Sequence, residues 1–174
     1  LSLFRRVGHS LWLSYPPDPL CDSPWFGVES GAARRYYGEC LALRRRLGSP
    51  GAIGLALYSL GRLEVDAGDV DAAAPLLDEA LLLMRRIEDR RGVALALNAL
   101  GRAALRRGLP LQAEPLINEA LAVFAELGNR VDIPECLEEL AFVAEAKGQL
   151  LAASRLLGAS AALRARTGAY VSVD

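Results

Sequence analysis

Apolar side chains recur along this chain with a short helical spacing and with a long spacing of 40 residues. Leucines and alanines three and four positions apart, as at Leu97 and Leu100, mark one buried face of a helix. The columns that agree when the chain is shifted by 40 residues are Leu57, Leu97 and Leu137; Leu60, Leu100 and Leu140; Gly68, Gly108 and Gly148; and Ala73, Ala113 and Ala153. Agreement over three periods without an insertion indicates a tandem internal repeat.

Each period predicts two helices that are separated by short turns. Ser49, Asp89 and Asn129 stand where the first helices begin, and all three are typical N-cap residues. The glycine column ends those helices, because glycine adopts the left-handed cap conformation at little cost. The predicted helices cover residues 31–47, 51–67, 70–87, 90–107, 110–127, 131–147 and 150–166.

Small residues are expected where the two helices of a pair cross. We predict that Gly61 faces Ala73 and that Gly101 faces Ala113 in antiparallel pairs, because bulk there would push the helix axes apart. A single pair cannot bury its apolar faces, so neighbouring pairs must stack. The chain is therefore predicted to be all-α, a right-handed α-solenoid of antiparallel helix pairs.

The repeat does not cover the whole chain in the same way. Residues 1–30 are predicted to be a degenerate or irregular repeat remnant, residues 31–168 the repeats and residues 169–174 a truncated tail. Residues 11–28 contain four prolines and cannot form the expected helix, so they are either a loop or the product of a locally wrong reading frame. The pattern stops within a period, and we expect the chain to be a fragment.

The residue pattern of each period resembles a known family. The first helix carries Leu-X-X-Leu-Gly, a glycine ends it, and the second helix carries alanine, a large apolar residue and alanine. This pattern resembles the tetratricopeptide repeat, with cores at residues 54–87, 94–127 and 134–167. The third core departs from the pattern, because Ala141 and Ser160 replace the usual glycine and alanine.

The amino-acid sequence of residues 120–168 is similar to that of a narrower group of repeat proteins. It resembles the C-terminal repeat tract of large bacterial signalling ATPases and of LuxR-type transcriptional regulators. This resemblance implies a scaffold for recognition of a protein or a ligand, as the sensor or interaction region of a larger bacterial regulator. Neither a P-loop nor a DNA-reading helix-turn-helix occurs in these 174 residues. A free-standing adaptor and a purely structural spacer are the alternatives.

A concave groove lined by the first helices is the expected binding site. The residues predicted to escape the buried face there and to bind a ligand are Tyr58, Arg62, Asn98, Arg102, Arg106 and Glu138. Arg62 and Arg102 occupy equivalent positions, roughly 10 Å apart by helix packing distances, and could hold a carboxylate or a phosphate. The alternative is a solvated face on which the arginines pair locally, for example with Glu64 or Asp66.

Charge and composition exclude several other functions. The net charge of −1 argues against direct binding of nucleic acid, and the near absence of lysine is typical of a GC-rich bacterial genome. One histidine, His9, and three scattered cysteines offer neither a catalytic triad nor a metal site, so we predict no enzyme activity and no cofactor. Cys40 and Cys136 are predicted to be small core residues in a reducing cytoplasm. No apolar run reaches the roughly 18 residues of a membrane span.

The last predicted helix presents leucines that no later helix in the sequence covers. These are Leu156, Leu157 and Leu163. An uncovered apolar end of a repeat stack is prone to association. The expected partners are therefore a protein or peptide, a small-molecule inducer as an alternative, and a second copy of the chain through its uncapped end.

Overall fold

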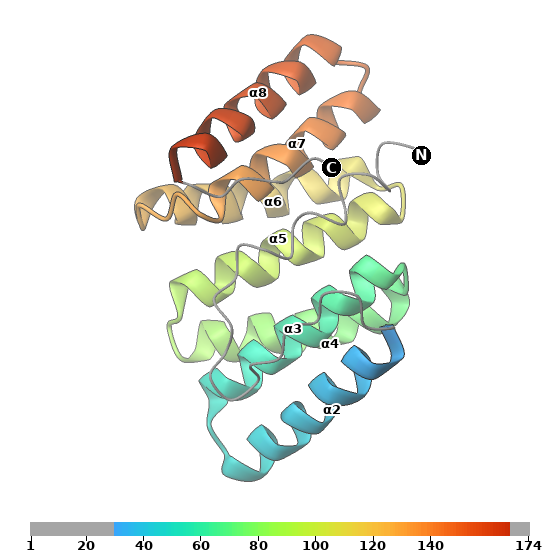
Figure 1. Cartoon of the computed structure of the whole chain (residues 1–174), viewed down its shortest axis with the longest axis vertical. Helices are drawn as coiled ribbons and strands as arrows, with labels where there is room; N and C mark the ends of the chain where they lie inside the picture. Colours follow the sequence, from blue (N-terminus) through green and yellow to red (C-terminus); the bar gives the residue numbers. More distant parts are fainter. Residues whose placement is uncertain (1–29, 168–174) are drawn as a thin grey trace.

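A computed structural model describes residues 30–167 of the chain, and this part folds into seven α-helices without a strand (Figure 1). The helices are α2 (Ser30–Leu47), α3 (Pro50–Ala67), α4 (Val70–Arg86), α5 (Arg90–Arg106), α6 (Pro110–Glu126), α7 (Ile133–Ala146) and α8 (Leu150–Thr167). Their bounds agree with the predicted ranges to within two residues. The predictions for residues 1–29 and 168–174, including the proline-rich segment, lie outside the described residues.

Helix ends follow the expected chemistry at most positions. The side chain of Asp89 accepts a hydrogen bond from the backbone N–H of Gly92 at 2.9 Å, as an N-cap should. Ser49 precedes α3 but makes no such bond. The first helix of the third pair begins two residues later than predicted, after Asp132, and Asn129 donates to the Asp132 carboxylate at 2.6 Å. Asn129 therefore stabilises the turn before the helix rather than capping it.

A residue in the left-handed conformation follows each of the helices α2 to α7. Gly68, Gly108 and Gly148 have φ of +88°, +75° and +74°, which confirms the predicted glycine caps. Glu88 has φ of +58° at the turn after α4, where the equivalent turns use glycine. A non-glycine residue in this region carries some strain, so the turn after α4 departs from the pattern of its neighbours.

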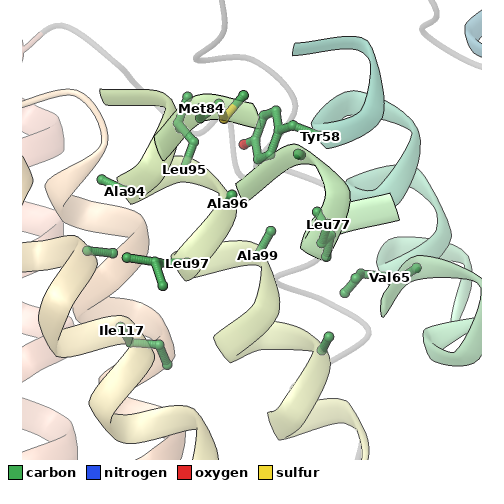
Figure 2. Packing of buried hydrophobic residues seen from close by; sticks show 14 of the residues in the cluster. Tyr58, Val65, Leu77, Met84, Ala94, Leu95, Ala96, Leu97, Ala99 and Ile117 are labelled. Atoms are coloured by element: carbon green, nitrogen blue, oxygen red, sulfur yellow. The ribbon is translucent and has the colours of Figure 1, made fainter. Parts of the chain in front are cut away.

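The helices stack as antiparallel pairs, α3 with α4, α5 with α6 and α7 with α8, and α2 packs at one end on α3 (Figure 1). The all-α solenoid predicted from the repeat is thereby confirmed. The fully buried leucine and isoleucine side chains are Leu57 and Leu97 of one predicted column, together with Leu77 and Ile117. Figure 2 shows Leu97, Leu77 and Ile117 inside the stack.

Glycine permits a close crossing of α3 with α4 and of α5 with α6, and at each glycine a branched side chain lies closer than the alanine that we expected. A Cβ atom added to Gly101 would lie 2.5 Å from Cγ1 of Ile117 and 3.3 Å from the carbonyl oxygen of Ala113. At Gly61 the added atom would lie 2.7 Å from Cγ of Leu77. The branched side chain one turn after the predicted alanine therefore covers each glycine, because it reaches over the crossing point.

Candidate functional site

The residues that we predicted to line a groove are on the expected helices but are mostly not exposed. Tyr58 and Arg62 on α3 are 4% and 8% exposed, and Asn98 and Arg102 on α5 are each 4% exposed. The prediction that these four side chains escape the buried face is wrong. The physical reason is that carboxylates from neighbouring helices neutralise the arginines, which makes their burial tolerable.

Arg102 is the centre of this buried polar group. Its Nη1 donates to Oδ1 of Asp66 on α3 at 3.0 Å, and its Nε lies 2.9 Å from Oε1 of Glu139 on α7. Nη2 of the same guanidinium makes a very close contact with the carboxylate of Glu135, also on α7. One arginine in the middle repeat therefore joins acidic residues of the repeats on both sides.

Arg62 reaches the same carboxylate from the first repeat. Its Nη2 lies 3.4 Å from Oε1 of Glu135, and its Nη1 donates to the hydroxyl of Tyr58 at 3.0 Å. The predicted arginine pair thus does hold a carboxylate, but this carboxylate is the chain's own Glu135. The side chains of α3 and α7 meet across α5, so the three first helices share one continuous polar interior on this side of the stack.

The two remaining predicted residues take different places. Arg106 is half-buried, with 23% of its side chain exposed, and its Nη2 lies 3.9 Å from Oδ1 of Asp66. Glu138 accepts two hydrogen bonds of 2.9 Å from Arg164 on α8 and one of 2.6 Å from Ser160. Arg106 therefore joins the group around Arg102, whereas Glu138 belongs to a separate contact within the third pair.

We call the group on α3, α5 and α7 the first-helix network. It consists of Arg62, Asp66, Arg102, Arg106, Glu135 and Glu139. Three arginines and three carboxylates balance, so the network has no surplus positive charge for an anionic ligand. Local pairing, the alternative that the sequence left open, is what the structure contains, although the paired groups are buried rather than solvated.

Burial also changes the acidity of one member of the network. The pKa of Glu139 is raised, chiefly because the carboxyl is buried, and the charges of Asp66 and Glu138 raise it further. Arg102 opposes this shift by favouring the charged form. Desolvation outweighs the ion pair, so the carboxyl of Glu139 takes up a proton at a higher pH than an ordinary glutamate does.

Asn98 lies one turn before Arg102 on α5 and is a buried polar residue of a different kind. Its Oδ1 accepts no hydrogen bond from any residue that the structure describes. A buried carbonyl oxygen without a donor costs free energy, about 1–3 kcal/mol in typical cases. Since this oxygen is buried, a donor from a bound molecule would reach it only if neighbouring side chains moved.

Sequence reasoning named Asp66 as a local partner but missed the other two carboxylates of the network, Glu135 and Glu139. Glu135 and Glu139 lie four residues apart on one face of α7, in the columns that hold Leu95 and Ala99 in the preceding repeat. A carboxylate in a column of apolar residues predicts a buried partner of opposite charge. The replacement of Leu95 and Ala99 by glutamates in the next repeat could therefore have predicted the buried ion pairs.

The cysteines and the acidic residues provide no further site. Cys136 is buried, and burial raises the pKa of its thiol to about 12, which agrees with its predicted place in the core. Cys40 is only partly buried. Within residues 30–167 no group of histidine, cysteine, aspartate and glutamate side chains could hold a metal ion. None of the helices described has the length and hydropathy needed to cross a membrane.

Comparison with known proteins identifies the repeat. The family model for the tetratricopeptide repeat matches residues 52–126, which comprise most of α3 and all of α4, α5 and α6. This segment is therefore similar to tetratricopeptide repeats, and α7 with α8 continues the same packing of helix pairs beyond it. No curated protein matches the chain. Tetratricopeptide repeats generally mediate protein–protein interactions and are typically non-catalytic.

Proposed function

We propose that the side of the stack formed by α3, α5 and α7 recognises an extended peptide or a protein segment. The repeat class supports this, because stacked repeats present continuous surfaces to a partner. Tyr58, Arg62, Asn98 and Arg102 place polar groups along this side. Since the network neutralises its own charges, the partner is held by hydrogen bonds and packing rather than by its net charge.

The unsatisfied Oδ1 of Asn98 is the observation that carries this proposal. Every backbone N–H of an extended peptide is a donor, and one of them would satisfy this buried acceptor. Binding would then remove a cost that the unbound fold bears. A ligand without a donor gains nothing at this position, so the site favours peptides and amides over purely anionic ligands.

A peptide selection with a matched pair of variants tests this function. Peptides are selected from a random display library on the immobilised chain, and their affinities are then compared for Asn98→Leu and Asn118→Leu. Asn118 is an exposed asparagine on the second helix α6, so it controls for the loss of an amide. We expect Asn98→Leu to weaken binding about tenfold, the value of one hydrogen bond, and Asn118→Leu to have no effect.

The affinity of Asn98→Leu for the selected peptides also gives the result that would overturn the proposal. If the selected peptides bind Asn98→Leu as tightly as the unchanged chain, the side formed by α3, α5 and α7 is not the recognition surface. Asn98→Leu replaces an unpaired buried amide by an apolar side chain of similar size, so the fold should tolerate it. Unchanged circular dichroism and an unchanged unfolding midpoint check this point.

We further propose that the chain works as the interaction or sensor region of a larger cytoplasmic signalling regulator in bacteria. The resemblance of residues 120–168 to the repeat tracts of such regulators supports this proposal. Sequencing the coding DNA on both sides tests it: a P-loop ATPase or a helix-turn-helix module in the same reading frame is the expected result. An open reading frame without either module would favour a free-standing adaptor instead.

A further inference from the structure

One row of residues on the second helices forms the contact between successive repeats. On α4 this row is Val70, Ala74, Leu77 and Leu81, and on α6 it is Pro110, Glu114, Ile117 and Leu121. In both helices every residue of the row is buried or partly buried, because it lies between the first helix of its own pair, at Gly61 or Gly101, and the first helix of the following repeat. The row is thus the surface on which each repeat receives the next.

On α8 the same row is uncovered. It consists of Leu150, Ser154, Leu157 and Ala161, and all four residues are exposed. Leu157 shows the difference most clearly, since it is 40% exposed whereas Leu77 and Ile117 in the same column are 0% exposed. Leu150 is 69% exposed. Of the other leucines predicted to be uncovered, Leu156 and Leu163 are partly buried, so the open surface is centred on Leu157 instead.

The open row also lacks the charges that accompany the earlier contacts. Arg85 on α4 lies 3.6 Å from Glu119 on α6, but alanines occupy both equivalent positions in the next step, Ala125 and Ala159. Lys147 pairs with Glu114 of the α6 row, and the residue in that column on α8 is Ser154. The row itself therefore offers apolar packing and no charged group to whatever covers it, although Arg155 and Arg166 are exposed elsewhere on α8.

We propose that a second copy of this chain covers the row, through antiparallel packing of the two α8 helices about a two-fold axis. The surface continues the repeat-to-repeat contact already formed twice within the chain. It is uncharged and alternates in size, with leucines at positions 150 and 157 and small residues at 154 and 161. In an isologous pair each patch meets itself, so a self-complementary pattern is required.

The spacing of the row satisfies that requirement. When two α8 helices run antiparallel with their rows facing, Leu150 of one copy lies over Ala161 of the other, and Leu157 lies over Ser154. Each large side chain then meets a small one, which permits close packing of the two helices. A parallel arrangement in register would instead place leucine on leucine and leave gaps between the small residues.

The molecular mass of the full chain in solution tests the pairing. Light scattering after size exclusion should give about twice the 18.7 kDa of one chain at micromolar concentration. Leu157→Glu places a charge in the centre of the contact and should reduce the mass to that of one chain. Leu82→Glu is the matched control, because Leu82 is 69% exposed on α4 outside the row and its change should leave the dimer intact.

Leu150→Glu is the second variant, with the same expected loss of the dimer and with unchanged helical circular dichroism as the check on folding. Mixing chains that carry Ser154→Cys with chains that carry Leu157→Cys should give a disulfide between copies, whereas Leu82→Cys in place of either should not. The proposal is overturned if the chain is still monomeric at about 100 µM, a concentration near the highest dissociation constant that a functional dimer would have. That result would favour a helix of another protein as the partner. A dimer that survives both glutamate substitutions overturns the proposal as well.

Discussion

The two sides of this stack use the same kinds of charged residue in opposite ways. On the first-helix side, Arg102 and Glu135 have side chains only 5% and 10% exposed, and they join three repeats. On the second-helix side, Arg85 and Glu119 are 56% and 53% exposed and join two neighbouring helices. We call the exposed pairs of α2, α4 and α6, Arg45–Glu79 and Arg85–Glu119, the second-helix ladder.

The ladder follows the 40-residue period and the network does not. Arg45 and Arg85 are equivalent positions, as are Glu79 and Glu119, so the ladder repeats one contact twice. The contacts of the network do not recur in this way, because Glu135 and Glu139 stand where the preceding repeat has Leu95 and Ala99. Because exposed pairs are screened by water whereas buried pairs are not, we expect the irregular network to matter far more for stability than the regular ladder.

Removal of the central carboxylate of the network should have the largest effect. Glu135→Ala leaves the guanidinium groups of Arg62 and Arg102 buried with one partner fewer, and unpairing a buried ion typically costs about 3–5 kcal/mol. Urea unfolding followed by circular dichroism measures the change. The control Glu119→Ala removes the same atoms from the ladder, and equal losses in the two variants would show that burial makes no difference.

The apolar contact inside a helix pair should have the next largest effect. Gly101→Ala forces a methyl group against Ile117 and should destabilise the fold by about 1–3 kcal/mol, in spite of the better helix propensity of alanine. Gly38→Ala on α2 is the control. No atom of the described chain lies within 4 Å of the added methyl there, so that variant should gain up to about 1 kcal/mol. The unfolding midpoint should fall for Gly101→Ala and rise for Gly38→Ala, and a change of the same sign in both variants would contradict the close contact at Gly101.

Glu139 of the network should also make the stability of the fold depend on pH. The pKa of Glu139 is raised in the folded state, so the folded protein binds this proton more tightly than the unfolded chain does. Its contribution therefore falls as the pH rises from the ordinary glutamate pKa through the folded pKa. Glu139→Gln cannot titrate, and its stability relative to the unchanged chain should increase over that range.

Urea midpoints measured for both proteins between pH 4 and pH 8 (a range that spans about four pKa units above an ordinary glutamate) provide the readout. A constant difference between the two proteins across the range would mean that Glu139 keeps an ordinary pKa. Glu79→Gln on the ladder is the matched control for the loss of an exposed carboxylate.

The smallest effect belongs to the ladder itself. Glu119→Ala should cost less than about 1 kcal/mol, because an exposed pair gains little in water. That cost should shrink further in 1 M salt, where the screening length is only about 3 Å. Unfolding midpoints at low and high salt measure it, and a loss above about 2 kcal/mol that salt does not change would contradict the assigned role.

The fold was predictable because the spacing of apolar residues and the identity of the turn residues specify the repeat. Columns such as Leu57 with Leu97, and Gly68 with Gly108, specify helix faces and helix ends locally. These local signals require no knowledge of distant partners. The helix bounds and the stacked, all-α architecture therefore agree with the sequence to within two residues at each end.

The burial and pairing of the predicted site residues were not predictable from the repeat pattern. Arg62 has the position of a groove residue, and only the placement of Glu135 more than seventy residues later shows that it is buried and paired. A periodic pattern describes what repeats share, whereas this pair depends on a residue at which one repeat differs. Charged residues in apolar columns, as at Glu135 and Glu139, are therefore the positions at which a repeat sequence is most informative about its interior.

A pair of double-mutant cycles tests the central difference between the two sides most directly. One cycle combines Arg102→Ala with Glu135→Ala, and the other combines Arg85→Ala with Glu119→Ala, with free energies of unfolding measured for all variants. We predict a coupling energy above about 1.5 kcal/mol for the buried pair and below about 0.5 kcal/mol for the exposed pair. Equal coupling energies, or a buried pair without coupling, would contradict the account.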